Sequence, residues 1–144
     1  MAKRSQASTV GAAGGLSVLG HDVPGPVDHV ECFPAPEHCV RVRFVSDEVT
    51  SMCPVTGQPD VSTVVIDYRP AERCVESKSL KHFLWSFRDR GIFAEALAGE
   101  IAAEVMRATE SDGVRVVVTQ HVRGGIVTEA WAELGTPPPA RGVT

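Results

Sequence analysis

The chain has 144 residues, a formal net charge of −4, 22% charged residues and 43% hydrophobic residues. This length suffices for one domain with its own core, and the composition is ordinary for a globular protein. The negative charge creates no general attraction for nucleic acid, and no apolar run approaches the ~20 residues needed to span a bilayer. We therefore expect a cytoplasmic protein with no direct nucleic-acid or membrane partner.

Residues 1–22 are rich in Ala, Gly and Ser and show no hydrophobic periodicity. This composition predicts a disordered N-terminal tail, followed by a single domain over residues 23–144. Val40, Val42 and Phe44 alternate with arginines and predict a first strand. A loop is expected from about residue 47 to residue 59, and alternation over residues 62–68 predicts a second strand.

Two helices and a hairpin are expected in the second half of the chain. Leu80, Phe83, Leu84 and Phe87 follow helical spacing, and Ser77 or Ser79 is the expected cap. The apolar stripe of the second helix is formed by Phe93, Leu97, Ile101, Val105 and Ala108. Residues 114–122 and 126–131 then predict a hairpin. The order ββααββ predicts an α+β fold, with an antiparallel sheet and both helices on one face.

Four cysteines are present, at positions 32, 39, 53 and 74, and none forms a CxxC pair. Without a secretion signal, we expect reduced thiols. Cys32, His38 and Cys39 are close in sequence but lack a standard zinc spacing, so we expect no metal site. Cys53 lies in a predicted loop with Pro54, where reactive groups concentrate, although a buried cysteine acting as a small hydrophobe is the commoner case.

Asp60 follows Cys53 by seven residues, so a turn can return it to the thiol, although it would serve equally well as a turn residue. Residues 76–81, with the sequence ESKSLK, surround the first helix start. They fit either a capped helix with solvated lysines or an anion site, to which Arg123 could contribute. Glu95 in the second helix suits the helix dipole and could also accept N–H donors from a guanine-like base.

Four segments together carry a family resemblance. They are residues 50–60 (TSMCPVTGQPD), 76–81 (ESKSLK), 86–88 (SFR) and 123–126 (RGGI). In order and spacing, over about residues 38 to 135, they closely resemble the NADPH-dependent nitrile reductases of queuosine biosynthesis, the QueF family. The resemblance implies a tunnelling fold (T-fold) in its short, single-module form. It also implies a homo-oligomeric ring, with a decamer as one form, and active sites between neighbouring subunits.

The resemblance implies reduction of the nitrile of 7-cyano-7-deazaguanine to 7-aminomethyl-7-deazaguanine with two NADPH, a step toward queuosine in tRNA. Cys53 would be the nucleophile that forms a thioimide, and Asp60 the acid–base residue. The family pattern also assigns binding residues. Glu76, Ser77 and Glu95 would bind the deazapurine, and Lys78, Ser79, Lys81 and Arg123 would bind NADPH.

One position departs from the family pattern: the residue before Glu95 is usually histidine and is Ala94 here. Two alternatives therefore stay open. An amidine-forming transferase would use the same thioimide, but such relatives lack the lysines at positions 78 and 81. A non-catalytic T-fold module would only bind a deazapurine or a partner, and the loss of the histidine at Ala94 motivates this alternative.

Overall fold

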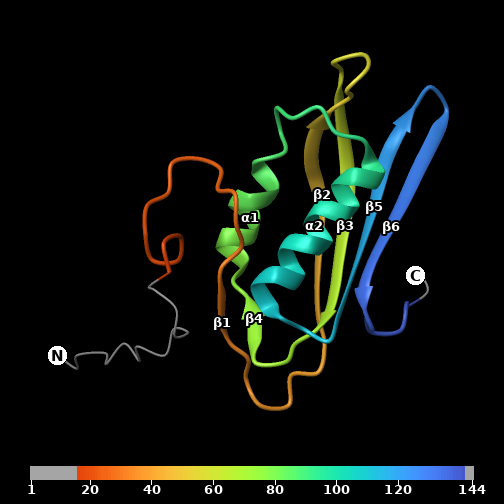
Figure 1. Ribbon diagram of the computed structural model, residues 1–144. Helices are drawn as coiled ribbons and strands as arrows, with labels where there is room; N and C mark the ends of the chain where they lie inside the picture. The colour runs from red at the N-terminus through yellow and green to blue at the C-terminus, as the bar shows by residue number, and fades with distance from the viewer. Residues whose placement is uncertain (1–15, 142–144) are drawn as a thin grey trace.

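The computed structural model describes residues 16–141 as an antiparallel sheet, two helices and a short two-stranded ribbon (Figure 1). The four-stranded sheet has the order β2-β3-β5-β6, and the ribbon pairs β1 with β4. The element bounds are β1 Cys32–Pro34, β2 Val42–Met52, β3 Pro59–Arg69, β4 Arg73–Val75, α1 Ser77–Trp85, α2 Ala94–Thr109, β5 Gly113–Arg123 and β6 Ile126–Gly135. The predicted α+β architecture, with an antiparallel sheet and the main order ββααββ, is confirmed.

Two short strands, β1 and β4, were not predicted from the sequence. β1 and β4 have three residues each and pair antiparallel, with Phe33 opposite Cys74. Three residues are too few to show an alternation, so only the tertiary contact between distant segments defines these strands. The β1–β4 ribbon leads directly into α1 and thereby fixes where that helix begins.

The predicted loop over residues 47–59 was wrong in its extent. β2 continues to Met52 and β3 starts at Pro59, which leaves a connecting loop of residues 53–58. The register between β2 and β3 shifts between Ser46 and Val49. A β-bulge of this kind interrupts the two-residue period, which explains why the alternation was lost in the sequence.

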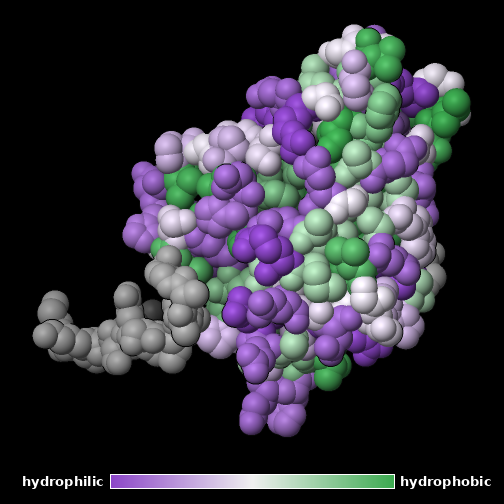
Figure 2. All heavy atoms as spheres, in the orientation of Figure 1, coloured by the Kyte–Doolittle hydropathy of each residue, from purple (hydrophilic) through white to green (hydrophobic). Residues whose placement is uncertain are grey.

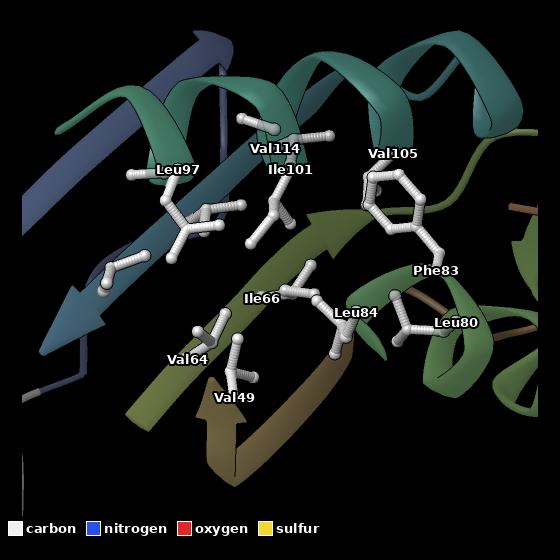
Figure 3. Packing of buried hydrophobic residues seen from close by; sticks show 14 of the residues in the cluster. Val49, Val64, Ile66, Leu80, Phe83, Leu84, Leu97, Ile101, Val105 and Val114 are labelled. Atoms are coloured by element: carbon white, nitrogen blue, oxygen red, sulfur yellow. The ribbon is translucent and has the colours of Figure 1, made fainter. Parts of the chain in front are cut away.

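The core lies between the sheet and the helices (Figure 3). Val64, Ile66 and Val116 face the helices from β3 and β5, and each is at most 1% exposed. From α2, the predicted stripe residues Leu97, Ile101, Val105 and Ala108 are all buried. Phe93 was wrongly included in that stripe: it precedes the helix as its N-cap residue and is 55% exposed.

The sheet face that points away from the helices carries an apolar row across all four strands. Val45 pairs with Val65, Val65 with Val117, and Val117 with Trp131. These residues alternate with the core residues, so their side chains point to the opposite face. Val45 is 62% exposed and Trp131 is 52% exposed. The described part of the chain therefore leaves an apolar strip of the sheet in contact with solvent.

The predicted tail over residues 1–22 lies partly outside the described residues, which begin at Leu16. Within the described part, Val18 is 1% exposed, so this residue packs against the domain, whereas residues 19–22 are exposed. Among residues 16–141, no helix is long and apolar enough to cross a membrane.

Candidate active site

The loop that carries Cys53 is closed by its own backbone. The Cys53 N–H donates to the Gln58 carbonyl at 2.8 Å, and the Gly57 N–H donates to the Cys53 carbonyl at 2.9 Å. Gly57 has a φ of +66°, in the left-handed region that glycine adopts without steric cost. These contacts hold Cys53 at the tip of the β2–β3 hairpin on a short, ordered loop.

The sulfur of Cys53 lies among donors that stabilise a thiolate. The Thr56 hydroxyl, the Thr56 N–H, the Arg123 guanidinium and the Val55 N–H together lower the pKa of Cys53 to about 6. Hydrogen bonds to the charged form favour that form, so Cys53 is mainly a thiolate at neutral pH. Thr56 was not assigned a role from the sequence, although its place three residues after the nucleophile was visible there.

The other thiols differ from Cys53. Burial raises the pKa of Cys32 to about 11 and also raises the pKa of Cys74. A thiol in apolar surroundings is a poor nucleophile because its charged form is disfavoured. All four cysteines are free, and residues 16–141 contain no group of three or more side chains that could hold a metal ion.

Asp60 and Arg123 complete a cluster at the hairpin tips. Asp60, the second residue of β3, is 5% exposed. Arg123 is the last residue of β5, and its Nη1 lies 3.2 Å from Asp60 Oδ1. The same nitrogen lies 3.5 Å from Thr56 Oγ1 and 3.5 Å from Gln58 Oε1. Arg123 therefore reaches the Cys53 loop from the neighbouring hairpin.

The start of α2 is attached to the same end of the sheet. The Met52 N–H donates to the Arg90 carbonyl at 2.8 Å, and the Ile92 N–H donates to the Met52 carbonyl at 3.1 Å. These bonds place the first turn of α2 beside the strand that ends at Cys53. Glu95 lies in that turn, exposed to solvent, whereas Ala94 is 4% exposed and packs into the core.

The residue that caps α1 is Glu76, so the predicted cap at Ser77 or Ser79 was wrong. The Glu76 carboxylate accepts the N–H of Lys78 at 2.7 Å and the N–H of Ser79 at 2.8 Å. A carboxylate has two oxygens and can satisfy two of the orphan donors at a helix start, whereas a serine hydroxyl usually satisfies one. Glu76, which is 6% exposed, is therefore the N-cap residue of α1.

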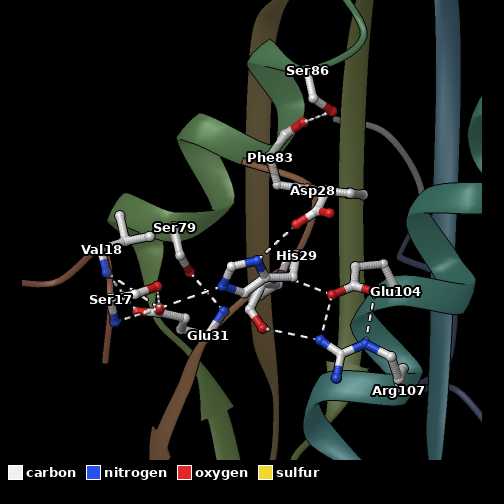
Figure 4. Close-up of polar contacts among 11 residues, drawn as sticks. Ser17, Val18, Asp28, His29, Glu31, Ser79, Phe83, Ser86, Glu104 and Arg107 are labelled. Atoms are coloured by element: carbon white, nitrogen blue, oxygen red, sulfur yellow. Dashed lines mark hydrogen bonds and ion pairs between the residues drawn. The ribbon is translucent and has the colours of Figure 1, made fainter. Parts of the chain in front are cut away.

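A second network binds the described N-terminal segment to this helix start (Figure 4). Ser79 Oγ donates to the Glu76 carbonyl at 2.8 Å and accepts the Glu31 N–H at 2.9 Å. The Glu31 carboxylate accepts the Ser17 N–H at 2.6 Å. The Lys78 ammonium donates to the His21 carbonyl. Ser79 and Lys78 are therefore both engaged within the chain.

A groove of about 640 Å³ lies between β2 and α1. On its helix side, the groove is lined by Ser77, Leu80, Lys81, Leu84 and Trp85. Thr50 of β2 lines it as well, three residues before Cys53. The groove lies between the helix start and the strand that leads to Cys53.

The predicted site residues thus fall into two groups. The hairpin-tip cluster consists of Cys53, Asp60 and Arg123, and Glu95 lies on the neighbouring α2 start. The α1 start carries Glu76, Ser77, Lys78, Ser79 and Lys81. In the structure, Arg123 lies beside Asp60 in the hairpin-tip cluster, whereas the family resemblance groups it with Lys78 and Lys81.

Comparison with known proteins assigns the family. Residues 59–139 match the family described as QueF-like protein. The chain is 47% identical over 110 residues to the NADPH-dependent 7-cyano-7-deazaguanine reductase of Alkalilimnicola ehrlichii, covering 75% of this chain and 85% of that protein. It is 39% identical over 130 residues to the reductase of the same name from Granulibacter bethesdensis, covering 86% and 85% of the two chains.

A solved structure has the same fold. The crystal structure of the archaeosine synthase QueF-Like in the apo form superposes with a TM-score of 0.65 and 28% sequence identity. The superposition covers 72% of this chain and 99% of that chain. It confirms the predicted T-fold, and together with the sequence matches it shows that this chain belongs to the QueF-like protein family.

Proposed function

We propose that this protein reduces the nitrile of 7-cyano-7-deazaguanine to the aminomethyl group of 7-aminomethyl-7-deazaguanine, with NADPH as reductant, in queuosine biosynthesis for tRNA modification. The observation that carries the proposal is the Cys53 thiolate at the hairpin tips, linked to Asp60 through Arg123. It occurs in a chain 47% identical to a protein named as that reductase.

The chemistry follows from this pair of groups. The Cys53 thiolate adds to the electrophilic carbon of the nitrile and forms the S–C bond of a thioimide. The nitrile nitrogen must take up a proton in this step, and Asp60 is the acid in our assignment. Because Cys53 reacts as the thiolate, this step takes up one proton, which would reach the nitrogen from solvent through Asp60.

Glu95 and Ser77 are the proposed ligands of the deazapurine, and Glu76 is the proposed supporting residue of this substrate site. Glu95 is exposed at the start of α2, so its carboxylate is free to accept paired N–H donors of a guanine-like edge. Ser77 faces the groove. Because the oxygens of Glu76 already accept two backbone N–H groups, we assign Glu76 the role of holding Ser77 in place.

The residues of the groove fit a phosphate-bearing cofactor. Lys81 lines the groove beside the first turn of α1, where its ammonium group suits a phosphate. Lys78 and Arg123 are the further cofactor contacts in this proposal, and Ser79, whose buried hydroxyl is hydrogen-bonded within the chain, would support the helix start beside the groove. Bound there, NADPH would supply the hydrides for the two reduction steps.

We further propose a cytoplasmic homo-oligomer of ring type, with active sites between subunits. Exposed hydrophobic residues support an interface: Val55, Val122 and Ile126 are 79%, 65% and 69% exposed at the hairpin tips, where Figure 2 shows hydrophobic surface. The apolar row that ends at Val45 and Trp131 also remains uncovered in a single described chain. Free cysteines fit the reducing conditions of the cytoplasm.

An amidine-forming transferase is the second candidate. The observation that favours it is the superposition with the archaeosine synthase QueF-Like, at 28% identity. Such an enzyme would use the same thioimide but release it to an amine, with no reduction. Lys81 in the groove favours the reductase, because a transferase needs no phosphate-bearing cofactor.

The test is to incubate the purified protein with 7-cyano-7-deazaguanine and NADPH, and to measure nicotinamide absorbance and the mass of the base. The reductase requires two NADPH oxidised for each aminomethyl product. A protein–base adduct that forms while NADPH stays unoxidised would overturn the reductase. Addition of an amine then separates the remaining two functions, since only a transferase would release an amidine product.

A further inference from the structure

The backbone around Arg123 directs its side chain toward the Cys53 loop. Gly124 and Gly125, with φ values of +61° and +79°, form the tight turn between β5 and β6. Two consecutive residues with positive φ are typical of a type I′ hairpin turn. The β5–β6 register also shifts between Gln120 and Arg123, and bulges of this kind re-aim side chains. Arg123 thus lies at a hairpin tip where a tight turn and a register shift set the direction of its side chain.

The contacts of Arg123 within the described chain all involve the nucleophile loop and its acid. The guanidinium forms an ion pair of 3.2 Å with Asp60, and it approaches the side chains of Thr56 and Gln58 at 3.5 Å. The Asp60 side chain is almost fully buried, and a buried carboxylate is costly without a nearby positive charge. Arg123 supplies that charge and is also one of the donors that lower the pKa of Cys53.

We propose that Arg123 is a positioning residue for nitrile capture, whose guanidinium holds the Cys53 thiolate and the Asp60 carboxyl in one arrangement before any cofactor binds. The inference rests on the proposed function and differs from a role in cofactor binding alone. A guanidinium keeps its charge at all working pH values and offers several N–H donors in a fixed geometry. One such group can therefore serve the sulfur and the carboxyl together.

The first experiment measures the reactivity of Cys53 without substrate. Alkylation by iodoacetamide is followed against pH, with the modified peptide identified by mass spectrometry. In the wild type, the rate should be half-maximal near pH 6, because only the thiolate reacts. Arg123→Gln should move this midpoint upward by about one pH unit, and Arg123→Lys, which keeps the charge, should restore part of the shift.

The second experiment measures adduct formation with 7-cyano-7-deazaguanine in the absence of NADPH. At about pH 5, below both midpoints, Arg123→Gln should slow the adduct about tenfold, because there one unit of pKa changes the thiolate fraction about tenfold. The matched control is Arg73→Gln, which removes a half-exposed arginine paired with Glu110, away from the site, and should leave both measurements unchanged. Circular dichroism of each variant verifies folding.

Two outcomes separate this inference from the proposed function. If Arg123→Gln alkylates and forms the adduct like the wild type and only requires more NADPH, Arg123 acts on the cofactor and the inference is overturned. If the wild type forms no adduct with the nitrile but the alkylation midpoint still shifts in Arg123→Gln, the inference stands and the proposed substrate is wrong.

Discussion

The hairpin tips and the start of α1 both concentrate polar residues, but they use them differently. At the tips, Arg123 pairs with Asp60 and, together with Thr56, lowers the pKa of Cys53. At the start of α1, the side chains of Glu76 and Ser79 are hydrogen-bonded to backbone N–H and carbonyl groups. The comparison teaches that a family motif can mix residues that act on ligands with residues that build the helix holding them.

The largest effect is expected for Cys53→Ala. Without a thiolate the nitrile has no nucleophile, so both the adduct and NADPH oxidation should disappear, as measured by mass spectrometry and absorbance. Cys39→Ser is the control, since Cys39 lies in the loop before β2 and away from the tips. Wild-type turnover in Cys53→Ala would remove the hairpin tips as the reactive region.

Asp60→Asn should lower turnover by about 10² to 10⁴-fold, the usual contribution of a positioned acid–base group. Asparagine keeps the shape of the side chain but cannot transfer the proton. The rate of NADPH oxidation at saturating substrate measures this loss, and Cys53 alkylation in the same variant tests whether the loop is intact. A rate within twofold of wild type would assign the proton transfer to another group.

At the start of α1, Lys81→Ala should raise the NADPH concentration needed for half-maximal rate about tenfold, with a smaller change in kcat. Lys81 lines the groove, so its ammonium is available to a cofactor phosphate. Arg43→Ala on the opposite sheet face is a suitable control, since Arg43 does not line the groove. If the NADPH requirement stays unchanged, the groove binds something other than the cofactor.

The smallest effect on the reactive thiol is expected for Glu76→Ala, which separates the two regions. Loss of the cap leaves two N–H groups of α1 unsatisfied, so the free energy of unfolding in urea should fall by about 2 kcal/mol. The pH midpoint of Cys53 alkylation should not move, because the cap and the thiol belong to separate networks. Unchanged stability with weaker deazapurine binding would make Glu76 a direct ligand instead.

Local patterns predicted much of the fold. The helical spacing of Leu97, Ile101 and Val105 can be recognised from residues one helical turn apart in the sequence. These residues are buried as expected. The β1–β4 ribbon and the last residues of β2 were missed. Pairing between distant segments has no local period, and the bulge near Val49 removes the period that a strand would otherwise show.

For the site, the loop chemistry around Cys53 was visible in the sequence, since Pro54, Gly57 and Asp60 follow it at close spacing. The role of Arg123 was not visible. Arg123 is followed by two glycines, and its contacts lie more than sixty positions away at Thr56, Gln58 and Asp60. Only the pairing of β3 with β5 brings the two hairpin tips together.

The sequence by itself determined the order of the main elements, the identity of the reactive loop and the family resemblance, because these depend on residue type and short spacing. The tertiary structure decided that Cys53, rather than Cys32 or Cys74, is favoured as a thiolate, since Thr56 and Arg123 lower the pKa of Cys53 while burial raises the pKa of Cys32 and Cys74. Electrostatic environment depends on distances in space, and those distances are set by how the strands pair.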